Sequence, residues 1–188
     1  MKFTQNNRFF VSHDDVLQLF NHALQKLVIT DMILLNVDAQ ERAIAARLAM
    51  YLRDDLLFAE NHDIFVDVEY NRDGDDMKRP APNSTGVWIA PDIIIHERKS
   101  GAYQGEDKYR NDIVYIEVKK NSKENQADAQ KVLEQMKQRK YQYGVDLYRL
   151  SAQEIKLNLY ECSGTLKTSC QFDFASNILR EVNYGNTH

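Results

Sequence analysis

The sequence predicts an α/β fold in which a central mixed β-sheet is flanked by helices. Two observations carry this prediction: segments with the apolar period of helices occur early and in the middle of the chain, and segments that alternate like strands lie between and after them. A chain of 188 residues is long enough for one good core and too short for two ordinary domains. We therefore expect one domain over residues 1–188, with an N-terminal helix at about 12–29, a core at about 38–160 and a C-terminal extension at about 161–188.

Two helices are predicted before the first strand. Ser12 and Asp15 have the spacing of a helix cap, and an apolar stripe of helical period follows them. Asp38 and Glu41 have capping-box spacing at the start of a second stripe, which consists of Ile44, Ala45, Leu48, Leu52 and Leu56. Both helices are expected to pack through these stripes.

Three β-patterned segments come next. Residues 64–70 alternate apolar and polar side chains and end at residues 71–74, which have turn chemistry. Residues 87–96 are the second predicted strand, and a third runs from about residue 113 to Lys119. The connection between these two is too long for a tight hairpin.

A third helix and further strands complete the prediction. The helix is expected at about 123–141, and Gly144 is expected to mark its end. Its apolar stripe consists of Ala129, Val132, Leu133 and Met136. Further strands are predicted at 145–150 and 155–160, with a short one at 171–174.

Composition limits the class of protein. The formal net charge of -4 argues against a protein that coats nucleic acid by bulk attraction. The longest apolar stretch, around 28–37, is too short for a membrane span, and the N-terminus lacks a signal core, so we expect a cytoplasmic protein that does not enter membranes. Cys162 and Cys170 lack the spacing of zinc ligands or of a disulfide framework, and both are expected to be reduced.

Acidic and basic side chains occur within the second predicted strand and at the end of the third. Alternation along a strand points Glu117 and Lys119 to one face. Asp92 follows Pro91, which removes a ladder donor and leaves the aspartate free to turn toward a ligand. Glu41 shares the apolar face of its helix, so its carboxylate is expected to point toward the sheet.

Each of these residues also has a purely structural explanation. Glu41 could bond the backbone amide of its cap, and Asp92 could belong to an ordinary turn after proline. Glu117 and Lys119 could form a salt bridge on a half-exposed strand. The order in which the four residues occur is more specific than any one of them.

The set resembles the PD-(D/E)xK, or restriction-endonuclease-like, nuclease superfamily. Asp92, Glu117 and Lys119 match its three-part motif, and Glu41 matches the helix glutamate of many members. The fit is closer to small stand-alone bacterial members, which carry stretches similar to residues 69–72, 91–92 and 116–120. The resemblance spans roughly residues 38–150 and implies a restriction-endonuclease-like core.

The resemblance implies an endonuclease-like enzyme that hydrolyses phosphodiesters with Mg²⁺ or Mn²⁺. Asp92, Glu117 and the Val118 carbonyl would hold the metal, and Glu41 would reach it directly or through water. Lys119 would orient the attacking water or stabilise the transition state. One departure counts against an exonuclease: neither Tyr141 nor Tyr143 has a glutamine four residues earlier, as in helicase-linked exonucleases of the superfamily.

Nucleic acid is the expected partner, with DNA favoured over RNA. Residues 119–140 carry seven basic and three acidic side chains, although on charge alone a solvated helix face is the favoured explanation. The candidate phosphate contacts are Arg72, Lys78, Arg79, Lys120 and Lys123. A homodimer would suit a duplex, since cutting both strands together needs two sites. The alternative is a catalytically silent nuclease-fold protein that binds nucleic acid or a protein partner.

Overall fold

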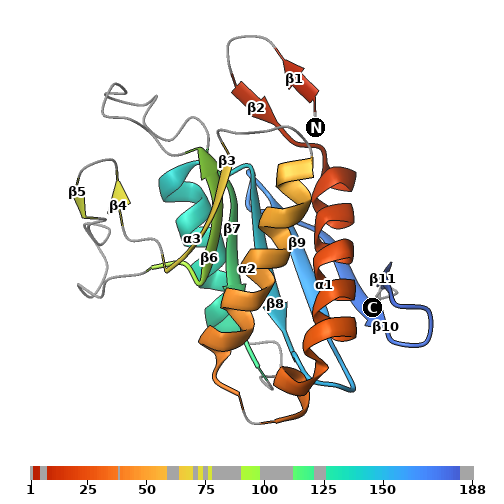
Figure 1. Cartoon of the computed structure of the whole chain (residues 1–188). Helices are drawn as coiled ribbons and strands as arrows, with labels where there is room; N and C mark the ends of the chain where they lie inside the picture. The colour runs from red at the N-terminus through yellow and green to blue at the C-terminus, as the bar shows by residue number, and fades with distance from the viewer. Residues whose placement is uncertain are drawn as a thin grey trace, which may run out of the picture.

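The protein was analysed as a computed structural model of the whole chain (Figure 1). The structure describes residues 2–4, 8–37, 39–58, 64–69, 72–73, 76–77, 90–97, 112–120 and 126–182. In chain order its elements are β1 (Lys2–Thr4), β2 (Arg8–Phe10), α1 (His13–Asn36), α2 (Glu41–Phe58), β3 (Ile64–Val68), β4 (Arg72–Asp73), β5 (Asp76–Met77), β6 (Ile93–Glu97), β7 (Asp112–Val118), α3 (Gln126–Arg139), β8 (Tyr143–Tyr148), β9 (Lys156–Glu161), β10 (Leu166–Asp173) and β11 (Ile178–Glu181). Among these elements, no helix is long and apolar enough to cross a membrane.

A seven-stranded mixed sheet forms the centre of the molecule. Its strand order is β11-β10-β9-β8-β7-β6-β3, and β7 and β8 are its parallel neighbours while the other pairs are antiparallel. Because parallel neighbours need a crossover, α3 connects β7 to β8 across one face of the sheet. The pairs β1–β2 and β4–β5 form separate two-stranded sheets. The predicted mixed α/β class is thus confirmed.

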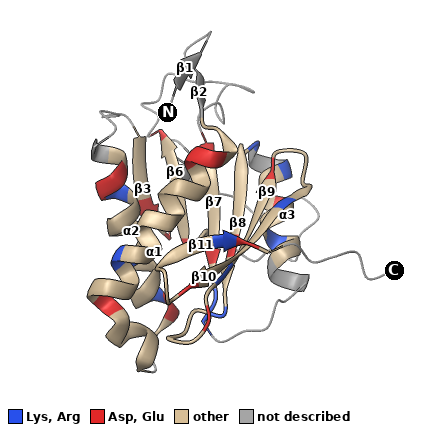
Figure 2. Ribbon diagram, turned by 90° about the vertical axis from the view of Figure 1, so that its right-hand side faces the viewer, with Lys and Arg blue, Asp and Glu red and all other residues tan. Residues whose placement is uncertain are grey.

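Helices cover both faces of the sheet, as Figures 1 and 2 show. The helices α1 and α2 lie on one face, where their apolar stripes pack in one cluster with Val114, Ile116 and Val118 of β7. On the other face, α3 packs over a smaller cluster that includes Tyr115 of β7 and Ile94 of β6. Strand alternation therefore divides the side chains of β7 between two environments.

The predicted cap of the first helix is confirmed, but the helix is longer than expected. Ser12 and Asp15 form a reciprocal capping box, and α1 then continues to Asn36 rather than ending near residue 29. Its backbone departs from helical geometry at Asp31 (φ -122°, ψ 26°), and that side chain is bonded by Arg47 through Nε at 2.7 Å and Nη2 at 3.0 Å. The apolar stretch after residue 28 therefore continues the helix beyond a kink.

The prediction for Gly144 is wrong, since this residue lies inside β8 and α3 already ends at Arg139. A Cβ at position 144 would lie 2.4 Å from Met136 Sδ and 2.5 Å from Val132 Cγ1. Glycine is therefore required here by the close approach of α3 to the sheet, and not by a turn.

Two strands differ from the prediction at their ends. The second predicted strand begins at Ile93, because residues 90–92 are not paired as a strand, while residues 87–89 lie outside the described residues. The short strand expected at 171–174 is the longer β10, and β11 was not predicted. These two strands extend the main sheet, so the segment from about residue 161 is part of the core architecture.

Candidate functional site

The structure brings the start of β6 next to the end of β7. Ile93 pairs with Ile116 in antiparallel register, which places Asp92 beside Glu117. The Val118 N–H donates a hydrogen bond of 2.8 Å to Asp92 Oδ2. Asp92, which follows Pro91 and lies in a bend, is thereby tied to the neighbouring strand. The predicted convergence of Asp92 and Glu117 is thus seen in the geometry.

Glu117 is a completely buried carboxylate with two side-chain partners. Its side chain is 0% exposed, the Tyr115 hydroxyl donates to Oε1, and Lys131 Nζ donates to Oε2 at 2.8 Å. Burial raises the pKa of Glu117 above its ordinary value, the charge of Asp92 adds to this, and Lys131 and Tyr115 oppose it. The half-exposed salt bridge with Lys119, considered from the sequence, is not the contact that Glu117 makes.

Glu41, the first residue of α2, meets the end of β7 with both carboxylate oxygens. The Lys120 N–H donates to Oε1 at 2.9 Å, and Lys119 Nζ lies 3.4 Å from Oε2. The side chain is 41% exposed, so it faces the site from the rim rather than from the core. Asp38, its partner in the capping-box alternative, lies outside the described residues.

Lys119 places an ammonium group in the field of three carboxylates. Burial lowers its pKa, but the nearby charges of Asp92, Glu41 and Glu117 outweigh burial, so the pKa is raised above its ordinary value. The side chain is 25% exposed. A positive charge is therefore already stabilised where the four predicted residues meet.

The oxygen ligands of the site suit a divalent cation that is held by two carboxylates, rather than one enclosed by a complete set of protein ligands. In the described part of the chain, no three His, Cys, Asp or Glu side chains are grouped as metal ligands. Mg²⁺ commonly uses only one or two carboxylates and completes its shell with water and substrate oxygens. Asp92 and Glu117 can supply that pair, and the Lys119 ammonium, 3.4 Å from Glu41 Oε2, is the observation that a positive charge is already accommodated beside these acids.

The remaining predicted site residues fare differently. Val118 contacts Asp92 through its N–H. That the Val118 carbonyl binds a metal stays a prediction. Lys120 directs Nζ to the backbone oxygens of Val37 at 2.5 Å and Ala39 at 3.2 Å, which ties it to the connection between α1 and α2 rather than leaving it free for phosphate. The other proposed phosphate contacts cannot be placed: the structure describes only the backbone of Arg72, and Lys78, Arg79 and Lys123 lie outside the described residues.

Several buried polar residues on the α3 face are not among the predicted site residues. Tyr115, Asp146 and Asn158 are each 1% exposed, and the partly exposed Lys131 contacts Glu117 beside them. Asp146 lies beside Glu117 in the register of β7 and β8, and Asn158 lies beside Asp146 in that of β8 and β9. A polar residue at the centre of an otherwise apolar strand run was the available signal.

A partly buried hydrogen bond joins side chains of β3 and β6. His96 Nε2 is 2.8 Å from Asp67 Oδ2, and the His96 side chain is 3% exposed. The contact gives each residue a structural partner within the sheet.

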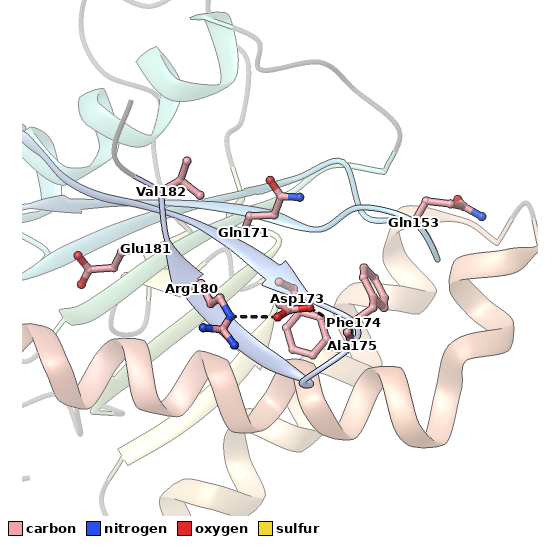
Figure 3. Close-up of a pocket in the computed structure, with 9 residues that line it drawn as sticks. Gln153, Gln171, Asp173, Phe174, Ala175, Arg180, Glu181 and Val182 are labelled. Atoms are coloured by element: carbon pink, nitrogen blue, oxygen red, sulfur yellow. Dashed lines mark hydrogen bonds and ion pairs between the residues drawn. The ribbon is translucent and has the colours of Figure 1, made fainter. Parts of the chain in front are cut away.

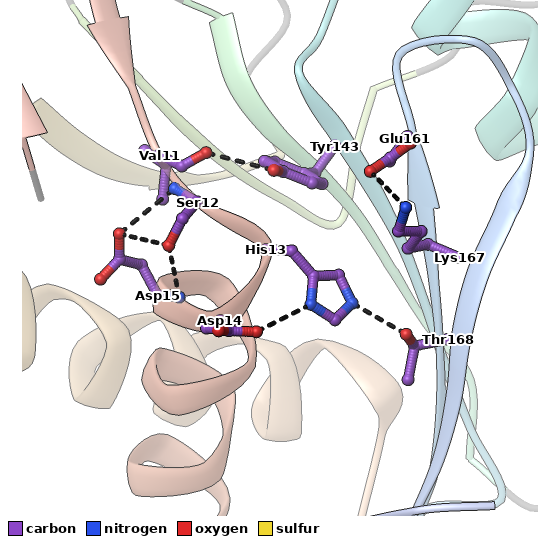
Figure 4. A network of polar contacts seen from close by, with 9 residues as sticks. All are labelled: Val11, Ser12, His13, Asp14, Asp15, Tyr143, Glu161, Lys167 and Thr168. Atoms are coloured by element: carbon purple, nitrogen blue, oxygen red, sulfur yellow. Dashed lines mark hydrogen bonds and ion pairs between the residues drawn. The ribbon is translucent and has the colours of Figure 1, made fainter. Parts of the chain in front are cut away.

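Two other polar regions lie away from the candidate site. A pocket of about 600 Å³ opens on β10 and β11, four strands from β6 in the sheet order, and contains an ion pair of Arg180 Nε with Asp173 Oδ2 at 3.0 Å (Figure 3). At the start of α1, His13 Nε2 lies 2.8 Å from Thr168 Oγ1, and the Tyr143 hydroxyl donates to the Val11 carbonyl (Figure 4). The latter contacts anchor α1 to the sheet.

Comparison with protein-family models, with curated proteins and with solved structures finds no match to this chain.

Proposed function

We propose that the protein is a metal-dependent phosphodiester hydrolase that acts as an endonuclease on DNA or RNA, with Mg²⁺ or Mn²⁺ at Asp92 and Glu117. The observation that carries the proposal is the meeting of these two acids with Glu41 and the Lys119 ammonium at the junction of β6, β7 and α2. Resemblance of the same residues to the PD-(D/E)xK motif supports it further. We regard DNA as the better substrate candidate. We further propose that the protein is cytoplasmic and acts on a duplex as a homodimer.

The proposed roles follow from what each side chain can do. A divalent cation held by Asp92 and Glu117 would supply Lewis acidity to the phosphodiester and lower the pKa of an attacking water. Lys119 would place its positive charge beside the phosphate, where charge grows in the transition state. Glu41 would hold that ammonium in position through its Oε2 contact. The Val118 amide fixes the orientation of Asp92.

A specific observation favours the alternative of a silent nuclease-fold protein. Both oxygens of Glu117 already have partners within the protein, the Tyr115 hydroxyl and the Lys131 ammonium. A carboxylate that is satisfied in this way has no need of a metal. In this case, the protein would bind nucleic acid or a protein partner without cutting.

A cleavage assay separates the two functions. Purified protein is incubated with single-stranded DNA, duplex DNA and RNA, each with Mg²⁺, with Mn²⁺ and with a chelator. We expect metal-dependent cleavage that falls by about 100-fold or more in Glu117→Gln and in Lys119→Met. Glu134→Gln is the matched control, because Glu134 is an exposed acid of α3 that contacts Gln130. No metal-dependent cleavage by the wild type on any of the three substrates would contradict the enzyme.

Metal binding can be measured without activity. In calorimetric titration with Mn²⁺, Asp92→Asn is expected to lose binding, because it removes one of two proposed ligands. Asp67→Asn serves as the control, since this acid is paired with His96. Equal loss in both variants would contradict the assignment of Asp92.

A further inference from the structure

Lys131 is the cation that contacts the most deeply buried acid of the candidate site. It projects from α3, and its Nζ lies 2.8 Å from Glu117 Oε2, while the other oxygen of that carboxylate accepts the Tyr115 hydroxyl. Glu117 is 0% exposed, whereas the Lys131 side chain is 30% exposed. The pair therefore joins a fully buried carboxylate to a lysine whose side chain is partly exposed to solvent.

The fold fixes the position of this ammonium. Val132 and Met136 of α3 pack so closely over β8 that even a single Cβ at Gly144 would collide with both. Lys131 directly precedes Val132, so the short distance between α3 and the sheet also brings Lys131 down to Glu117. The ion pair thus depends on a helix that is held against the sheet by its own apolar contacts.

A buried carboxylate requires a counter-charge, because desolvation disfavours its ionised form. Lys131 meets that requirement in the structure. A divalent cation bound by Glu117 would meet it equally well, and on Oε2 it would share or take the oxygen that Lys131 now contacts. The lysine and the metal would then be alternative counter-charges for one acid.

We infer that Lys131 is an exchangeable counter-ion of Glu117, which competes with the divalent cation and thereby sets the affinity of the site for metal. The inference rests on the proposed function, since it takes Glu117 as a metal ligand. It adds a positioning residue that acts through Glu117 and that the motif of the site does not contain.

Titration with Mn²⁺ tests the competition directly. Wild type, Lys131→Met, Lys131→Arg and the control Lys137→Met are compared by calorimetry at pH 8.5, where competition from protons is small. Lys137 is a suitable control because it is an exposed lysine of the same helix. We expect Lys131→Met to bind Mn²⁺ about tenfold more tightly, because the metal no longer displaces a charged hydrogen bond. Lys131→Arg should return the affinity toward that of the wild type.

Thermal unfolding of the same proteins distinguishes this role from a merely structural one. In chelator, Lys131→Met should unfold at a lower temperature than wild type, and saturating Mn²⁺ should narrow the difference. A purely structural lysine would leave the difference unchanged. If Lys131→Met does not fold, Lys131→Gln replaces it in both measurements.

The outcomes separate the inference from the function on which it rests. Equal or weaker Mn²⁺ binding in Lys131→Met than in the wild type, with binding intact in the wild type, would overturn the inference and leave the proposed function standing. Absence of Mn²⁺ binding in the wild type and in every variant would overturn both.

Discussion

The two faces of β7 differ in kind although their side chains alternate along one strand. Toward α1 and α2, the strand contributes Val114, Ile116 and Val118 to a large apolar cluster. Toward α3, it contributes Tyr115 and the fully buried acid Glu117. The first face therefore supplies most of the apolar burial that stabilises the fold. Because stability does not depend mainly on the second face, that face can contain a buried charged residue near the edge of the core.

The largest effect is expected from damage to the apolar face. Ile116→Ala should lower the free energy of unfolding by about 2–5 kcal/mol, because it leaves a cavity under α1 and α2. Urea denaturation measures the change. Ile178→Ala, at a position that is 43% exposed, is the control and should change stability by less than about 0.5 kcal/mol. Similar losses in the two variants would contradict the assignment of the main core to this face.

A smaller loss is expected on the α3 face from Gly144→Ala. The added Cβ must push Val132 and Met136 away, which should cost about 1–3 kcal/mol in urea denaturation. The substitution should also separate Lys131 from Glu117. Met136→Ala provides space for the new methyl group, so the double variant should be more stable than the sum of the two single losses predicts. If the losses of the two single variants simply add in the double variant, the close approach of α3 to Gly144 does not limit the packing.

The pH dependence of stability should have opposite signs on the two sides of the sheet. Hydrogen bonds from Arg47 and Tyr51 lower the pKa of Asp31 in the helix layer of the folded protein. The contribution of Asp31 to the free energy of unfolding is therefore present above about pH 3.9, and it is lost as the pH falls through the lowered pKa of the folded state. Burial raises the pKa of Glu117, so its contribution is present below about pH 4.3 and is lost as pH rises through the higher folded pKa.

Two variants check these signs by chemical denaturation across pH. Asp31→Asn should be less stable than wild type, and this difference in the free energy of unfolding should be largest near neutral pH and smaller in acid. As the pH rises above about 4.3, the free energy of unfolding of Glu117→Gln should instead increase relative to that of the wild type. Parallel pH profiles for the two variants would contradict the contrast between the faces.

The smallest perturbation concerns the two cysteines. Burial in the apolar cluster raises the pKa of Cys170 to about 12, with a further contribution from Glu181, whereas Cys162 is exposed. A thiol reagent at pH 8 should therefore label one cysteine in the native protein and both in denaturant, because the thiolate is the reactive form. Mass spectrometry identifies the labelled residue, and rapid labelling of native Cys170 would contradict its burial.

Local patterns predicted most of the fold. The capping box of Ser12 and Asp15 and the alternation along β7 depend on neighbouring residues, and both are seen in the structure. Gly144 was misassigned because glycine serves either a turn or a close approach, and only the helix above the strand decides between them. The strand β11 was missed because its short, mostly exposed run lacks the clear alternation of a half-buried strand.

The candidate site was predictable in part. Strand parity and helix phase placed Asp92, Glu117, Lys119 and Glu41 near one another, and the contacts around Lys119 agree with that placement. The partner of Glu117 could not be predicted, because Lys131 is one of several lysines that flank an apolar stripe. Its role depends on how α3 is rotated and how low it lies over the sheet, which sequence periodicity does not specify.

The double contact of Lys120 has a consequence for local opening of the protein. Its N–H bonds Glu41, while its Nζ bonds the carbonyls of Val37 and Ala39, so one residue joins the end of β7 to α2 and to the segment between α1 and α2. Movement of that segment must therefore disturb the carboxylate of Glu41. In hydrogen exchange, the Lys120 amide should report the undocking of the helix pair, and a ligand that steadies the candidate site should slow its exchange.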